Sequence, residues 1–134
     1  MRSSRWSDEE DASDRRALRQ PDRLYADRML VVTRTWRPAG LRFAGEIDVN
    51  NSSAVSDSLR RGFPDGGEHH IDLRSLIFCD ISGIRAFVDA ARNLEANHQL
   101  RLHGLPDQLE RVMKVTGWSD LPGLAMCSCE LDTE

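Results

Sequence analysis

The loop Asp80-Ile81-Ser82-Gly83 brings together the residue types best suited to chemistry in this chain. It follows an apolar run and leads into a predicted helix that starts at Ser82. The N-terminus of a helix carries unpaired N–H groups and a partial positive charge, so it can bind an anion. Ser82 can cap this helix or carry a phosphate, and Asp80 can accept hydrogen bonds from the turn. The residues alone leave both roles of Ser82 open.

A phosphate at this position would change binding more than folding. It would bring about two negative charges next to Asp80, and the helix N-terminus would neutralise them in part. A docked partner would instead meet a new charge at a desolvated surface. Losing a few kcal/mol there changes an affinity by orders of magnitude.

Patterns for metal binding are weak in this sequence. Cys127 and Cys129 are one residue apart rather than two, and no second pair completes a zinc set. His69 and His70 follow a glycine-rich turn, and we interpret them as a solvated entrance to a strand. We therefore expect no metal and no cofactor.

Patterns for catalysis are equally weak. Cys79 with His98 or His103 has no local signature of an activated nucleophile. Gly66-Gly67 lacks the Lys-Ser/Thr that completes a phosphate-binding loop. An enzyme of unknown type remains an alternative, and a binding function is the main prediction.

Composition narrows the class of partner. The chain has 134 residues, enough for one domain, and its net charge of −4 gives no basic footprint for nucleic acid or an anionic membrane. No run approaches the roughly 18–20 apolar residues of a membrane span, and no signal peptide is evident. Three cysteines, an odd number, favour reduced thiols and a cytoplasmic location.

The first half of the chain predicts a hairpin, a helix and two further apolar runs. Residues 29–33 and 41–44 flank the turn Arg37–Gly40 and indicate an antiparallel hairpin. Val55, Leu59 and Phe63 share one face of a helix that Asn50 or Asn51 can cap. Asp48 also precedes that helix and is a second candidate cap. A strand at residues 70–73 and an apolar run at 76–78 follow.

The second half predicts a helix from Ser82 to Asn97 or His98, a strand at 100–102, a third helix from Pro106 to Gly117, and a possible strand at 124–127. Strand, helix and strand in succession require parallel neighbours and a right-handed crossover. We therefore predict an α/β fold, a mixed β-sheet of about four to five strands with α-helices packed against it. Residues 1–24 are polar and charged and predict a flexible arm before a domain at 25–134.

Four motifs in the same order resemble those of STAS domains, the family of anti-sigma factor antagonists (anti-anti-sigma factors). They are Gly45-Glu46-Ile47-Asp48, the segment from Asp72 to Ile84, Leu105-Pro106, and Val115-Thr116-Gly117-Trp118. The resemblance covers roughly residues 28 to 128. It implies an anti-sigma factor partner, a serine kinase of the histidine-kinase-like ATPase type, whose capture releases a sigma factor for transcription.

In this family the kinase phosphorylates the serine directly after the aspartate of the loop, a position that Ile81 occupies here. Ser82, one residue later, is the phosphorylation candidate. The alternatives are a constitutive binder, and a regulatory or scaffold subunit of another complex, such as a lipid-transport complex or a sensory assembly. The expected partner-binding residues are Asp48, Asn51, Asp80, Ile81, Ser82, Gly83, Ile84, Arg85 and Asp89.

Overall fold

The computed structural model describes residues 22–36, 38–62, 68–95 and 98–127. Its strands are β1 (Arg23–Ala26), β2 (Leu30–Trp36), β3 (Ala39–Ile47), β4 (Glu68–Asp72), β5 (Leu76–Cys79), β6 (Gln99–His103) and β7 (Leu124–Cys127). Its α-helices are α1 (Ser52–Gly62), α2 (Ile81–Arg92) and α3 (Asp107–Thr116), followed by a short 3-10 turn at Trp118–Asp120. Within these ranges no helix is long and apolar enough to cross a membrane.

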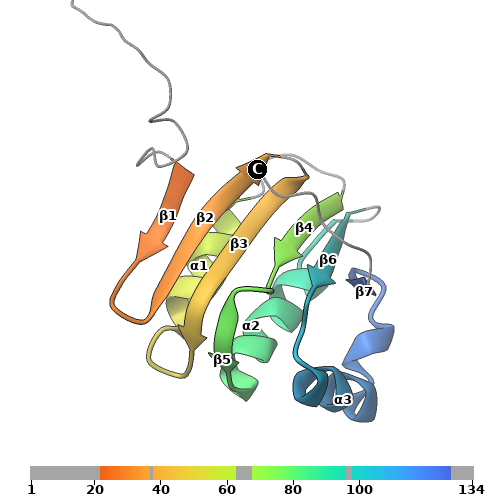
Figure 1. The fold of residues 1–134 in the computed structure, drawn as a ribbon. Coiled ribbons are helices and arrows are strands. Elements are labelled where there is room, and N and C mark those ends of the chain that lie inside the picture. Colours follow the sequence, from red (N-terminus) through yellow and green to blue (C-terminus); the bar gives the residue numbers. More distant parts are fainter. Residues whose placement is uncertain (1–21, 37, 63–67, 96–97, 128–134) are drawn as a thin grey trace, which may run out of the picture.

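All seven strands join one mixed sheet in the order β1-β2-β3-β4-β6-β7, with β5 paired to β3 (Figure 1). The pairs β1–β2 and β2–β3 are antiparallel, and the remaining pairs are parallel. The parallel pairs follow from the helical crossovers, because a chain that returns through a helix re-enters the sheet in the same direction. The α/β class and the mixed sheet are confirmed.

One edge of β3 carries two parallel strands end to end. β4 pairs with Gly40, Leu41 and Arg42, and β5 pairs with the end of the strand from Gly45 to Ile47. Gly45 marks the change of neighbour with a φ of 121°, a conformation that suits glycine, and its register to β5 is irregular. The backbone conformation at this point therefore explains why the first motif begins with a glycine, Gly45.

The core lies between the sheet and the helices. Side chains alternate along each strand, so Leu41 and Phe43 of β3 point to the helices while Arg42 points away. Phe43 meets Phe87 of α2 edge to face at 5.3 Å between ring centroids. α1 and α2 lie behind the sheet in Figure 1, which leaves the other face of the central strands free of these helices.

The structure corrects two expectations about elements. The sheet has seven strands rather than four to five, because the apolar run at 76–78 is itself β5 and Arg23–Ala26 form an additional edge strand. An edge strand pairs through backbone groups and needs little apolar patterning, so β1 left no clear sequence signal. α2 ends at Arg92 with Asn93 as its C-cap, not at Asn97 or His98.

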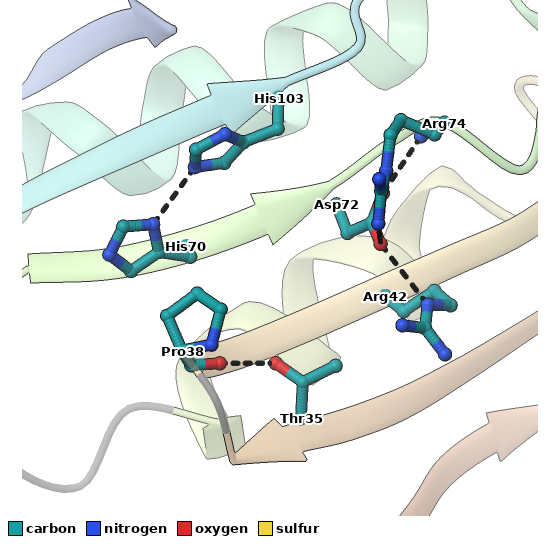
Figure 2. Close-up of polar contacts among 7 residues, drawn as sticks. All are labelled: Thr35, Pro38, Arg42, His70, Asp72, Arg74 and His103. Carbon is teal, nitrogen blue, oxygen red and sulfur yellow. Dashed lines mark hydrogen bonds and ion pairs between the residues drawn. The ribbon is translucent and has the colours of Figure 1, made fainter. Parts of the chain in front are cut away.

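Other expectations agree or lie outside the described residues. The hairpin forms, and the Thr35 hydroxyl donates to the Pro38 carbonyl at 2.8 Å across its turn (Figure 2). Gly117 ends α3 in the left-handed conformation with a φ of 83°, and the possible strand at 124–127 is β7. Residues 1–21 of the predicted arm and Phe63 are not among the described residues, whereas Arg23 and Leu24 belong to β1.

Candidate functional site

Asp80 organises the loop between β5 and α2. It is the N-cap of α2, and its Oδ1 accepts hydrogen bonds from the backbone N–H of Ser82 (3.0 Å) and Gly83 (3.4 Å) and from the Ser82 hydroxyl. Its own N–H donates to the Ile47 carbonyl at 3.1 Å, which ties the loop to the end of β3. The expected acceptor role of Asp80 is confirmed. Ser82 is not the cap; it lies in the first turn of the helix, half-buried.

Gly83 and Ile84 lie beneath this loop rather than on its surface. A Cβ atom at Gly83 would sit 2.6 Å from the Cys79 sulfur, so only glycine lets α2 start this close to the sheet. The Ile84 side chain is fully buried. Both were expected to contact a partner, and the structure places them among the buried residues of α2, where its apolar stripe begins.

The turn between β3 and α1 lies beside this loop. Asp48 Oδ1 accepts from the Asn50 N–H at 2.9 Å and closes the turn without capping α1. Asn51 Oδ1 accepts from the Asp48 N–H at 3.0 Å, and Asn51 Nδ2 donates to the Glu46 carbonyl at 2.9 Å. Asn51, expected to contact a partner, is therefore buried and holds the turn together.

Several exposed apolar side chains lie near this loop, and we call four of them the β5 patch. Its members are Val49, Ile77, Phe78 and Ile81. Ile77 and Phe78 lie in β5 and Ile81 begins α2, whereas Val49 follows β3, whose last residue Ile47 pairs with Cys79. These residues are four of the seven large apolar side chains exposed within the described ranges, so exposed apolar area concentrates at this end of the molecule.

Sequence reasoning named Ile81 but missed Val49, Ile77 and Phe78. The unbroken run Leu76-Ile77-Phe78 is typical of a strand covered on both faces. In the described part of the chain, however, β5 pairs with β3 alone, and Ile77 and Phe78 are 81% and 50% exposed. The available signal was the extra apolar run itself, which no helix in the sequence was predicted to cover.

Charged residues and a groove continue this surface along the helices. Arg85 and Asp89 of α2 are exposed, as expected, and Asp89 lies 3.8 Å from Arg92. A groove of about 380 Å³ runs between α1 and α2. Its lining residues are Ser56, Leu59, Arg60, Ala86, Asp89, Ala90, Asn93 and Leu94. Small side chains on α2 keep this groove open, and Asp89 connects it to the expected binding face.

A second cluster, which we call the polar face, lies on the side of the sheet away from α1 and α2. It consists of Arg42, Glu68, His70, Asp72, Arg74, Arg101 and His103. Asp72 Oδ2 lies 3.2 Å from Arg42 Nε and 3.0 Å from Arg74 Nη2 (Figure 2). His70 Nδ1 lies 2.8 Å from His103 Nε2, with the two rings stacked.

The histidines at 69 and 70 are not a solvated strand entrance. Both lie within β4, where His69 is buried on the helix side and His70 is half-buried on the polar face. Burial lowers the pKa of His70; Arg101 lowers it further, and Glu68 opposes the shift. Three polar residues open β4, so the pattern-based prediction of a strand at 70–73 began two residues too late.

Two other titratable groups are displaced by their surroundings. Burial alone would raise the pKa of Asp72, but the hydrogen bonds from Arg74 and Arg42 prevail and lower it to about 2. Burial, with Asp80 nearby, raises the pKa of Cys79 to about 12, so this thiol is not an activated nucleophile. Among the described residues, no group of three or more His, Cys, Asp or Glu side chains could hold a metal ion.

Comparisons with known proteins agree with this geometry. A family model described as "Mlab, STAS domain" matches residues 31–125. The anti-sigma-B factor antagonists of Listeria monocytogenes and Listeria innocua are each 35% identical over 80 residues, or 58% of this chain and 70% of theirs. The chain belongs to the STAS domain family of anti-sigma factor antagonists.

Two solved structures show the same fold. The crystal structure of an anti-sigma factor antagonist from Mycobacterium paratuberculosis has a TM-score of 0.59 at 17% identity and covers 72% of this chain and 84% of that one. The anti-sigma factor antagonist SpoIIAA in its unphosphorylated form has a TM-score of 0.53 at 19% identity, covering 75% and 89%. The STAS fold expected from the four motifs is therefore confirmed.

The cap that Asp80 provides should make a measurable contribution to the free energy of unfolding. Asp80→Ala removes the acceptor for two backbone N–H groups and should lower the free energy of unfolding by about 1 kcal/mol in urea titrations. Asp80→Asn keeps an oxygen at the same position and should recover most of that loss. Equal losses in the two variants would contradict the capping role.

The Asp72 ion pairs predict a loss of folding stability at acidic pH. A carboxylate whose pKa falls from 3.8 to about 2 on folding contributes about 2 kcal/mol above the unfolded pKa. This contribution is lost as the pH falls from about 4 towards 2. Asp72→Asn should therefore lower the free energy of unfolding at neutral pH. The difference in this free energy between the variant and the parent chain should become smaller as the pH falls from about 4 towards 2.

Asp57→Asn is the control for this measurement, because Asp57 forms exposed pairs with Arg60 and Arg61. It should change the unfolding curve little at any pH. If the difference in unfolding free energy between Asp72→Asn and the parent chain stays constant between about pH 4 and 2, Asp72 is not the source of the acid-dependent stability.

Proposed function

We propose that this chain is a non-catalytic, cytoplasmic anti-sigma factor antagonist that binds a serine-kinase-type anti-sigma factor and so controls sigma-dependent transcription. The kinase would be of the histidine-kinase-like ATPase type. The observation that carries this proposal is the β5 patch, an exposed apolar surface next to the Asp80–Ser82 loop. The names of the Listeria relatives support the same class of partner.

The arrangement suits a protein interface. Protein interfaces concentrate their binding energy in a few apolar or aromatic side chains surrounded by a polar rim. Phe78 and Ile81 supply such a centre, and Arg85 and Asp89 supply part of the rim. The Asp80 cap and the Asn51 hydrogen bonds hold both loops in place before binding, which limits the entropy lost on docking.

Ile81 is the departure that bears on regulation. Isoleucine has no hydroxyl group, so the position that the kinase modifies in the family cannot be phosphorylated here. The Ser82 hydroxyl donates to the Asp80 carboxylate, within the first helical turn. We infer that the chain binds its partner without phosphate control at this loop.

A second candidate function is a STAS regulatory or scaffold subunit of another complex, in lipid transport or a sensory assembly. Ile81 favours it, because such a subunit needs no phosphoacceptor. Affinity purification from the native cell extract separates the two. Recovery of a histidine-kinase-like ATPase with anti-sigma activity supports the first function, and its consistent absence alongside another complex supports the second.

The patch predicts one strong binding variant. Phe78→Ala should weaken the affinity for the purified anti-sigma factor by at least about tenfold in calorimetric titrations, because an aromatic anchor is removed. Val115→Ala is the control, since Val115 is also an exposed apolar residue but belongs to α3 rather than to the patch. Equal affinities for the two variants would count against the β5 patch as the interface.

The Ile81 position predicts a gain of modification. After incubation with the partner kinase and ATP, the parent chain should stay unmodified by intact-mass spectrometry. Ile81→Ser should take up one phosphate, because it places a hydroxyl on the exposed position directly after Asp80. A phosphate found on Ser82 of the parent chain would show instead that Ser82 is the acceptor.

A further inference from the structure

β5 carries one residue more than the stretch of β3 with which it pairs. Gly45 of β3 pairs with Leu76 of β5. The next residue of β3, Glu46, pairs with Phe78, so Ile77 has no opposite residue in β3. Two residues of one strand that oppose one residue of its neighbour form a β-bulge. A bulge disrupts the ladder of backbone hydrogen bonds, so this extra residue needs an explanation other than strand pairing.

The bulge changes which side chains of β5 are exposed. Successive side chains of a regular strand alternate between its two faces. The paired positions of β5 keep that order, because Leu76 packs against the core, Phe78 is half exposed and Cys79 is buried. Ile77 interrupts the order and is 81% exposed. Two adjacent apolar residues, Ile77 and Phe78, are therefore exposed, where regular alternation would expose only one.

The fold gains little from the apolar character of Ile77. A side chain stabilises a fold roughly in proportion to the apolar area that it removes from water, and Ile77 leaves most of its area in water. Its position requires a residue suited to extended backbone, and threonine, which is also β-branched, meets that requirement. A contact outside the chain explains an isoleucine here better than folding does.

The surroundings of Ile77 indicate which kind of surface it contacts. Phe78, the next residue, and Ile81, at the start of α2, are also apolar and exposed. The charged residue that follows, Asp80, directs its Oδ1 to the backbone N–H groups of Ser82 and Gly83. The carboxylate is thus engaged inside the loop, and the surface that covers Ile77 should be apolar.

We propose that the β5 bulge presents Ile77 as a further apolar anchor beside Phe78, and that one apolar surface of the anti-sigma factor covers both. This inference rests on the proposed function, because it names a contact of the β5 patch with that partner. A regular strand would offer the partner a single apolar side chain at this place. Ile77 is therefore a residue that determines the affinity and specificity of the interface.

Ile77→Thr in the full chain tests this contact, because it keeps a β-branched side chain and removes its apolar end. In calorimetric titrations its affinity for the purified anti-sigma factor should fall by about tenfold or more, whereas its urea midpoint should match that of the parent chain. Ile77→Leu, which keeps the apolar area, should retain most of the affinity. Val115→Thr is the matched control, since Val115 is also 81% exposed but belongs to α3, and it should bind like the parent.

The possible failures of the inference and of the proposed function are distinguishable. If Ile77→Thr binds as tightly as a parent chain that does bind, the inference is wrong and the proposed function still stands. A parent chain that binds no anti-sigma factor would overturn both. A clearly lower urea midpoint for Ile77→Thr would show that Ile77 serves the fold instead. A parent that sediments as a dimer, with Ile77→Thr as a monomer, would place Ile77 on a second copy and also overturn the inference.

Discussion

The arrangement of this molecule depends on β3 and its two successive partners along one edge. β3 is long enough, at nine residues, to pair first with β4 and then with β5. This pairing places the exits of β3 and β5 side by side, with Ile47 opposite Cys79. Both α1 and α2 therefore begin at the same end of the sheet, and the two loops that precede them form one continuous surface.

Each loop at this end is held by its own side chain, and the two are joined by one backbone hydrogen bond. Asp80 caps α2, Asn51 ties the β3–α1 turn to Glu46, and the Asp80 N–H reaches the Ile47 carbonyl. Polar groups are thus satisfied inside the loops, which leaves apolar side chains as the outward contacts. A surface of this kind loses little entropy on docking, because its backbone is already ordered.

The two faces of the sheet are built from different interactions. The helix face is an apolar core in which Phe43 and Phe87 meet edge to face. The other face carries ion pairs between residues about thirty positions apart, such as Arg42 with Asp72, and the stacked His70 and His103. The burial of these polar groups makes this face a poor apolar docking surface.

The sequence by itself determined the elements whose patterns are local. The stripe of α2, the hairpin and the αL glycine that ends α3 each depend on neighbours a few residues away, and the four motifs in order identified the STAS fold. Tertiary structure alone decided which residues of the site face outward. Asn51 and Ile84 turn inward, Ile77 and Phe78 turn outward, and His70 meets His103, because those outcomes depend on strand register and on which edge of β3 each strand takes. Local periodicity indicates which side chains are suited to burial or exposure. Only the packing of the sheet determines which side chains are in fact buried or exposed.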